Sequence, residues 1–124
     1  MSEVEYSSRQ NFEKSMHGHS AVASLKQIDC NVYRIERTEG RTPLVVRIAE
    51  IYIMGGCDVY EIMADNKNID AIVLVGYYNR YTSDAKKTAK ENKIALFRRD
   101  EFYGALHRTG KSFISYVPRP KKDN

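Results

Sequence analysis

The chain has 124 residues, of which 42% are hydrophobic and 29% are charged, a size and composition typical of one globular domain with its own core. It contains no run of about 18 apolar residues, and its acidic, polar N-terminus lacks the apolar segment of a secretory signal, which excludes a membrane-spanning helix and a membrane partner. We therefore expect a cytoplasmic protein. Cys30 and Cys57 form no CxxC pair, so both are expected to be reduced thiols.

The net charge of +4 is unevenly distributed along the chain. Residues 1–77 carry 8 basic and 11 acidic side chains (net −3), whereas residues 78–124 carry 12 and 5 (net +7). Such asymmetry indicates an anionic partner, with nucleic acid as the first candidate. The alternative is that the lysines simply form the solvated outer face of a helix.

Residues 1–8 are polar and are expected to be flexible. Apolar residues then recur at roughly helical spacing over residues 9–27, and Gly18 predicts either one bent helix or two short ones. His17 and His19 flank this glycine. Two residues apart on a helix they point to different sides, so we predict no metal site.

A β-hairpin is predicted next. Residues 30–37 alternate between polar and apolar side chains, residues 38–42 are rich in turn formers, and residues 44–54 form a second, mostly apolar run. Arg47 and Glu50 interrupt this run. Because lone buried charges are costly, one of them is expected to face a cleft, unless the strand ends just before Glu50.

Gly55 and Gly56 break the apolar run. Asp58 and Glu61 follow at the spacing of a capping box, and the apolar stripe after them predicts a helix.

The clearest pattern is a strand, helix and strand in direct succession. Residues 71–75 are apolar and β-branched, which is typical of a strand buried on both faces. Thr82 and Asp84 supply the start signals of a helix that ends at residues 92–93, and residues 94–97 form the next strand. Such a unit places its two strands parallel in one sheet.

The remaining residues complete the domain. Asp100 is expected to cap a last helix. Residues 109–117 are expected to form an edge strand, and residues 118–124 are expected to form a disordered basic tail. We therefore predict a single α/β domain over residues 9–117. It is expected to be layered, with a mixed sheet of about four strands and helices on both faces.

These residues carry a resemblance to a known family. An initial helix with Phe12 and Glu13, a hairpin, a helix and then residues 70–102 resemble the carboxy-terminal half of Mrr-type domains in the restriction-endonuclease-like, PD-(D/E)xK superfamily. The matching helix start is Thr-x-x-Ala, here Thr82 to Ala85. The resemblance implies an endonuclease-like fold, DNA as a partner, and a place in defence or nucleic-acid processing.

The family's chemistry uses an acidic residue on one hairpin strand and a (D/E)xK triplet on the next, so that two carboxylates hold Mg²⁺ or Mn²⁺. The triplet is absent from residues 44–50. Glu36 and Glu50 could still supply carboxylates, with Arg47 in place of the lysine, although arginine cannot act as a base at neutral pH. Nuclease activity is therefore doubtful, and a catalytically silent relative without a cofactor is the closer fit.

Nucleic-acid binding is predicted for the loop after residue 75 and the cations around it. Aromatic rings beside cations suit unstacked bases and phosphates, and a helix start offers N–H groups to a phosphate. The predicted binding residues are Tyr77, Tyr78, Asn79, Arg80, Tyr81, Thr82, Lys86, Lys87, Arg98 and Arg99.

Three functions remain open at this point. The first is a nucleic-acid-binding, endonuclease-like module without catalysis. The second is a divergent metal-dependent nuclease that uses Glu36 and Glu50. The third is a protein-interaction or homodimeric domain whose contact surface is the tyrosine-rich loop and an edge strand.

Overall fold

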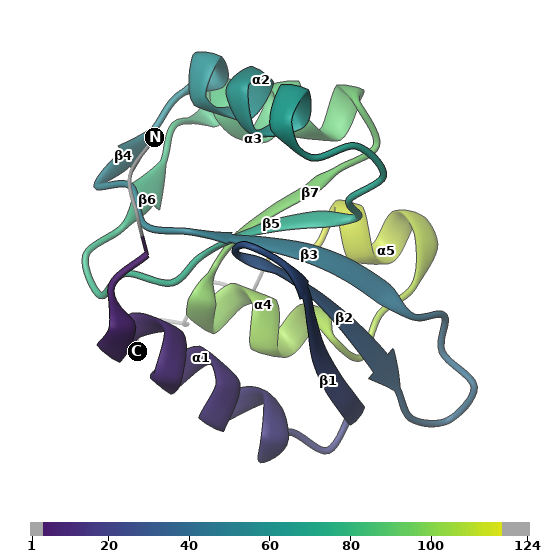
Figure 1. Cartoon of the computed structure of the whole chain (residues 1–124). Helices are drawn as coiled ribbons and strands as arrows, with labels where there is room; N and C mark the ends of the chain where they lie inside the picture. The colour runs from purple at the N-terminus through teal and green to yellow at the C-terminus, as the bar shows by residue number, and fades with distance from the viewer. Residues whose placement is uncertain (1–3, 118–124) are drawn as a thin grey trace, which may run out of the picture.

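The computed structural model describes residues 4–117. Its centre is a five-stranded mixed sheet, shown in Figure 1. In spatial order the strands are β1 (Val22–Asp29), β2 (Val32–Arg37), β3 (Leu44–Ala49), β5 (Ala71–Leu74) and β7 (Ala95–Arg98). β1, β2 and β3 are antiparallel neighbours, whereas β3, β5 and β7 run parallel. The predicted α/β class with a mixed sheet is confirmed, with five strands instead of about four.

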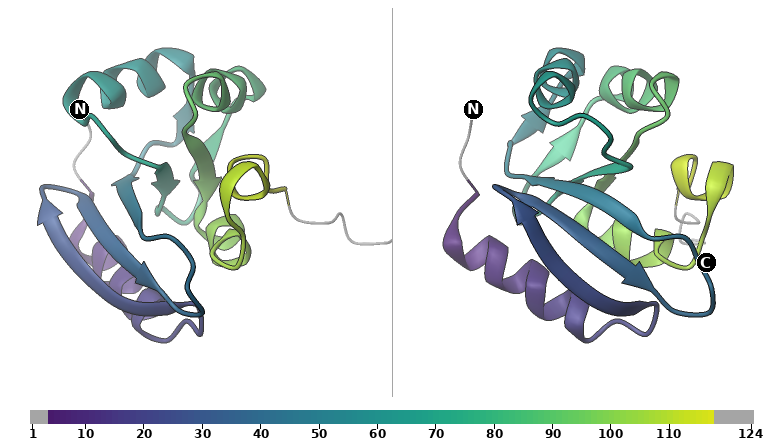
Figure 2. Two further views of the ribbon diagram at one scale, coloured as in Figure 1. Left: turned by 90° about the vertical axis from the view of Figure 1, so that its right-hand side faces the viewer. Right: turned by 45° about the vertical axis from the view of Figure 1, so that its right-hand side comes forward.

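Helices cover both faces of this sheet, as predicted. Helices α1 (Tyr6–His17) and α4 (Arg99–Ala105) lie on one face, and α2 (Gly56–Asp65) and α3 (Ser83–Glu91) lie on the other (Figures 1 and 2). The short helix α5 (Gly110–Ile114) packs beside β7. None of the helices formed by residues 4–117 has the length and hydropathy needed to cross a bilayer.

The sheet separates two hydrophobic cores. The core on the α1 and α4 side includes Phe12, Met16, Tyr33, Ile35, Phe97, Phe102 and Phe113. The core under α2 and α3 includes Met54, Val59, Ile62, Ile72, Leu74 and Leu96. All four residues of β5 are buried because both of its faces are covered, as the unbroken apolar run at this strand predicted.

The strand–helix–strand unit is confirmed in detail. β5 and β7 pair in parallel, with Ala71 opposite Ala95. The hydroxyl of Thr82 accepts a hydrogen bond from the Ala85 N–H at 3.0 Å, the N-cap contact that its side chain predicted.

The N-cap residues of α2 and α4 are Gly55 and Arg98 and differ from the predicted Asp58 and Asp100. α2 begins at Gly56, and Asp58 lies inside its first turn, where the carboxylate accepts the Gly55 N–H at 2.8 Å. In α4 the capping carboxylate belongs to Glu101, which accepts the Arg98 N–H at 2.8 Å, and not to Asp100.

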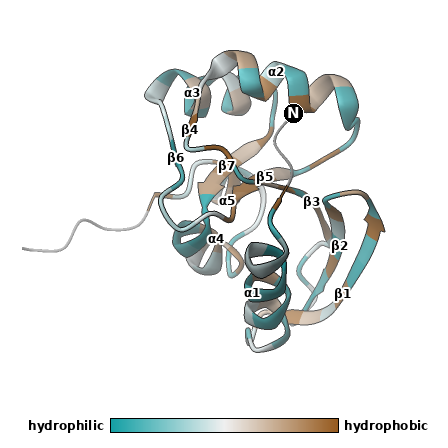
Figure 3. Ribbon diagram, turned by 60° about the vertical axis from the view of Figure 1, so that its left-hand side comes forward, coloured by the Kyte–Doolittle hydropathy of each residue, from teal (hydrophilic) through white to brown (hydrophobic). Residues whose placement is uncertain are grey.

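The predicted helix over residues 9–27 is wrong in its second half. α1 begins at Tyr6 and ends at His17, Gly18 is its C-cap, and β1 follows. β1 carries register shifts near both ends, and these bulges break the two-residue alternation by which a strand is recognised. Figure 3 shows mixed hydrophobic and hydrophilic residues along β1, which α2 and α3 do not cover.

Two other predicted strands differ from the structure. The edge strand expected at residues 109–117 is α5. The apolar run over residues 44–54 divides into β3 and β4 (Ile53–Met54), and β4 pairs in parallel with β6 (Arg80–Tyr81). The predicted basic tail at residues 118–124 and the first three residues of the predicted flexible N-terminus lie outside the described part of the chain.

Candidate nucleic-acid interface

Exposed tyrosines and arginines gather where the parallel strands end. The carboxyl ends of β3, β5 and β7 meet at one edge of the sheet, the edge at which open α/β sheets bind ligands. Tyr52 follows β3, Tyr77 and Tyr78 follow β5, and their exposed fractions are 65%, 78% and 76%. Large exposed aromatic rings are costly in water, so a cluster of them marks a contact surface.

Two guanidinium groups lie against these rings. The Arg80 guanidinium is 5.6 Å from the Tyr52 ring centre, and that of Arg99 is 6.0 Å from the Tyr77 ring centre. The Tyr77 and Tyr78 rings meet edge to face with their centres 4.8 Å apart. We call these five side chains the tyrosine–arginine surface: Tyr52, Tyr77, Tyr78, Arg80 and Arg99.

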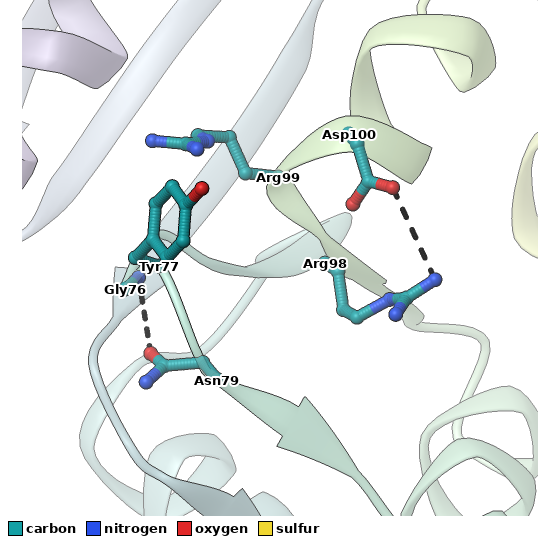
Figure 4. Close-up of a pocket in the computed structure, with 6 residues that line it drawn as sticks. All are labelled: Gly76, Tyr77, Asn79, Arg98, Arg99 and Asp100. Atoms are coloured by element: carbon teal, nitrogen blue, oxygen red, sulfur yellow. Dashed lines mark hydrogen bonds and ion pairs between the residues drawn. The ribbon is translucent and has the colours of Figure 1, made fainter.

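Asn79 holds the two tyrosine-bearing loops together. Its side-chain oxygen accepts a hydrogen bond from the Gly76 N–H at 3.0 Å, which Figure 4 shows, and a second from the Ile51 N–H, also at 3.0 Å. A Cβ on residue 76 would lie 2.4 Å from the Asn79 side chain, so only glycine allows this close approach. The short ladder between β4 and β6 adds a second link, because the Arg80 N–H donates to the Tyr52 carbonyl at 2.9 Å.

Replacing Asn79 by alanine is expected to lower the free energy of unfolding by about 2 kcal/mol, because two partly buried N–H groups lose their acceptor. Asn79→Asp is the matched control, since it keeps an oxygen at the same place and should lose less. Urea unfolding followed by circular dichroism measures both. Equal losses in the two variants would contradict the hydrogen-bonding role.

Tyr81 is directed inward, contrary to the prediction that it contacts nucleic acid. Its hydroxyl donates to the Glu101 carboxylate, with both oxygens 2.9 Å away. Burial and this carboxylate raise the pKa of Tyr81, which stays protonated. In the two-residue strand β6, Arg80 faces solvent and Tyr81 faces the interior, as strand alternation requires.

Lys86 is also turned away from solvent. Its ammonium group donates to the Leu96 carbonyl at 2.6 Å and lies over the Phe97 ring, 4.5 Å from the ring centre. Burial lowers the pKa of this ammonium group. The predicted phosphate contact of Lys86 is therefore replaced by a structural one, whereas its neighbour Lys87 is exposed on α3.

Of the other predicted binding residues, some belong to the candidate site and others have structural contacts instead. Thr82 uses its hydroxyl as a helix cap, and Asp84 already supplies negative charge in the first turn, so the start of α3 is a poor phosphate site. Arg98 lies 3.6 Å from Glu101 and 4.0 Å from Asp100, which offsets part of its charge. Arg99 belongs to the tyrosine–arginine surface.

The catalytic candidates do not form a site. In the β2–β3 ladder, Val32 lies opposite Arg47 and Ile35 opposite Leu44, so Glu36 is near one end of β3 and Glu50 follows the other. At 3.3 Å per residue their backbones are roughly 20 Å apart, too far to share a metal ion. This arrangement does not support the alternative of a metal-dependent nuclease that uses Glu36 and Glu50.

Each candidate has another partner. Glu36 forms an ion pair with Arg34 at 3.1 Å, and the Glu50 carboxylate accepts the Glu5 N–H at 3.0 Å. Arg47 is 3% exposed and donates to the Ile48 carbonyl, and burial lowers the pKa of its guanidinium. Within residues 4–117, no group of three His, Cys, Asp or Glu side chains is arranged to hold a metal ion.

Sequence reasoning missed Tyr52 and Asp100 as members of this edge. Tyr52 stands in an apolar run, and only the pairing of β4 with β6 brings it to Arg80. Pairing between strands of two residues leaves almost no signal in a sequence. The sequence favours Asp100 as a helix cap, but Glu101 takes that role in the structure and Asp100 lines the sheet edge.

Comparison with known proteins gives no family assignment: no family model matches the chain, and no curated protein or solved structure is significantly similar to it.

Proposed function

We propose that this domain binds nucleic acid through the tyrosine–arginine surface and does not cut it. The observation that carries the proposal is the set of three exposed tyrosine rings with two guanidinium groups lying against them. Aromatic rings stack on unpaired bases of any sequence, and adjacent arginines bind the phosphates between those bases. Single-stranded nucleic acid is therefore the expected ligand.

The charge distribution supports the same partner. Three of the five side chains of the tyrosine–arginine surface, Tyr78, Arg80 and Arg99, belong to residues 78–124, which carry a net charge of +7. Tyr77 immediately precedes this segment. A positive field of this kind attracts a phosphate backbone and makes binding sensitive to salt.

The absence of cleavage is supported by the hairpin. β3 carries no carboxylate, and Glu36 and Glu50 lie at opposite ends of the ladder. The order of elements, a helix and a hairpin followed by parallel strands with helical crossovers, agrees with an endonuclease-like fold. A degenerate member of that superfamily, serving defence or nucleic-acid processing, is our proposal for its origin.

The direct test is fluorescence anisotropy with labelled single- and double-stranded oligonucleotides at about 50 and 200 mM salt. The same mixtures, with and without Mn²⁺, are then run on a denaturing gel. We expect salt-sensitive binding, tighter for the single strand, with intact oligonucleotide. Shortened products would contradict the silent assignment, and no binding at the lower salt would overturn the whole proposal.

Arg80→Ala is expected to weaken binding of a single strand about tenfold and to reduce the slope of log affinity against log salt by about 1, because one phosphate contact is lost. Tyr78→Ala should also weaken binding about tenfold, but with the salt slope unchanged, because a stacked base is lost instead. Lys26→Ala is the matched control, because it removes an exposed cation on β1, outside the tyrosine–arginine surface. The same slope in all three variants would contradict this assignment of roles.

The exposed rings favour a second candidate, a homodimer formed through the same surface. Ile53, which follows Tyr52 and lies opposite Arg80 in the β4–β6 ladder, is 44% exposed and adds apolar area to the three tyrosine rings. Sedimentation equilibrium at both salt concentrations separates the two functions. A dimer held by apolar contacts keeps its mass at the higher salt and dissociates in Tyr78→Ala, whereas nucleic-acid binding weakens with salt.

A further inference from the structure

A hollow of about 360 Å³ opens at the carboxyl ends of β5 and β7. Its lining, drawn in Figure 4, consists of Gly76, Tyr77, Asn79, Arg98, Arg99 and Asp100. The hollow adjoins the tyrosine–arginine surface and shares Tyr77 and Arg99 with it. Its volume lies in the range of small-ligand sites, which begins at about 300 Å³.

We propose that this hollow holds one unstacked base of the bound strand and selects bases that carry an exocyclic amino group. The proposal rests on the proposed function, because it names the ligand of one part of the same surface. In this proposal the base stacks between Tyr77 and Arg99, and Asp100 selects which base is bound.

Tyr77 and Arg99 form one part of the lining of the hollow. The guanidinium carbon lies 6.0 Å from the ring centre, at the outer limit of a cation–π contact. Stacked bases are about 3.4 Å apart, so a base between two flat groups needs about 7 Å. A rotation of the exposed Tyr77 ring that widens the gap by about 1 Å would admit a base, with a cation on one side and an aromatic ring on the other.

Asp100 gives the hollow a hydrogen-bond acceptor. Asp100 presents a carboxylate whose side chain is 75% exposed, and its nearest cationic nitrogen, on Arg98, is 4.0 Å away. That distance is too long for a hydrogen bond, so the carboxylate keeps its capacity to accept one from a ligand. An ionised carboxylate cannot donate.

The bases differ in the hydrogen-bonding groups that they would present to this carboxylate. Cytosine, adenine and guanine each carry an amino group that can donate to a carboxylate. Thymine and uracil have a carbonyl acceptor in place of the cytosine amino group, and their N3–H donor lies between two carbonyl oxygens, which repel a carboxylate. The carboxylate therefore favours the first three bases over the last two. Arg98 and Arg99, which line the same hollow, offset the repulsion between Asp100 and the phosphates of the strand.

The test compares two homopyrimidine strands, oligo(dC) and oligo(dT) of 15 nucleotides, by fluorescence anisotropy at about 50 mM salt and pH 7.5. These strands have similar, weak stacking and differ in the amino group. The expected preference of the unmodified protein for oligo(dC) is about fivefold, the low end of the discrimination given by a good polar contact. Asp100→Asn should remove the preference, because its amide accepts from cytosine and donates to thymine equally well.

Two further variants make the result specific. Glu61→Gln, which neutralises an exposed carboxylate on α2, should keep the preference, and Tyr77→Ala should weaken both strands alike. Equal binding of the two strands that still depends on Arg80 would overturn the selective hollow and leave the proposed function standing. A preference that survives Asp100→Asn would also overturn it, and failure of both strands to bind would reject the proposed function together with the hollow.

Discussion

Replacing Arg37 by alanine is expected to lower the free energy of unfolding by about 3 kcal/mol, because removing this buried guanidinium would leave its hydrogen-bond acceptors without a donor. Arg37 is 7% exposed at the end of β2. It donates to the Thr42 carbonyl at 2.7 Å, to the Leu106 carbonyl at 3.1 Å and to the Arg108 carbonyl at 2.6 Å. Its guanidinium also lies 5.7 Å from the Phe113 ring centre.

These contacts join parts of the chain that are distant in sequence. Arg37 links the β2–β3 turn to the segment between α4 and α5. The acceptors lie around a planar guanidinium, and the single ammonium group of a lysine cannot reach all of them. Arg37→Lys is therefore expected to recover little of the stability lost in Arg37→Ala.

Arg34→Ala is the matched control on the same strand. Arg34 is exposed and its ion pair with Glu36 is solvated, so its loss should change the free energy of unfolding by less than about 0.5 kcal/mol. Urea denaturation followed by circular dichroism measures each variant. If Arg37→Ala were no more harmful than Arg34→Ala, the buried guanidinium would not be holding the α4–α5 segment.

The part of the fold that the sequence predicts well is the part in which local signals agree with the tertiary structure. The β-branched run of β5 is buried on both sides, and Thr82 caps α3 as its side chain indicates. Each signal acts within a few residues, so no knowledge of distant contacts is needed. The strand–helix–strand unit was therefore predicted nearly in full.

The errors arise where distant contacts decide. Residues 109–117 contain β-branched and aromatic residues that favour a strand, yet they form α5 because Phe113 packs into the core beside Phe97. Arg37, from the far end of the sheet, binds the carbonyls just before this helix. Propensity is a weak prior that such tertiary contacts override.

The sequence predicts which residue types form the candidate site, but it does not predict which of their side chains point toward solvent. Tyr78, Arg80 and Arg99 were expected to contact a ligand, and the structure exposes Tyr78 and Arg80 and places Arg99 over the Tyr77 ring. Tyr81 and Lys86 were expected to do the same and instead contact Glu101 and the backbone of β7. A stretch of mixed tyrosines and cations does not show which side chains turn inward, because the two-residue strand that orients them has no recognisable pattern.

Alkaline pH is expected to destabilise the fold between pH 10 and 12 because Tyr33 is held in its neutral form. Tyr33 is 1% exposed, and its hydroxyl donates to the Glu13 carboxylate and accepts from Arg9 at 2.9 Å. Burial and the Glu13 carboxylate raise the pKa of Tyr33 from 10.0 to about 12. Tyr81, whose pKa is also raised, adds to the effect.

The sign follows from proton linkage. Below pH 10 Tyr33 is protonated in both the folded and the unfolded chain, and its contribution to stability is complete. Between pH 10 and 12 the unfolded chain loses this proton and the folded chain keeps it, so the free energy of unfolding falls as the pH rises. A pKa difference of about 2 corresponds to about 3 kcal/mol for Tyr33 at full deprotonation.

Tyr33→Phe tests this reasoning, because it removes the titrating group and leaves the ring in the core. The variant should be about 1 kcal/mol less stable than the unmodified protein at pH 8, where a hydrogen bond is lost, and should lose less stability from pH 10 to 12. Tyr60→Phe, at an exposed position, should retain the full slope. The free energy of unfolding of all three proteins is measured by urea unfolding at each pH. If the three curves of this free energy against pH were parallel, α1 would not be held to the sheet by a neutral Tyr33.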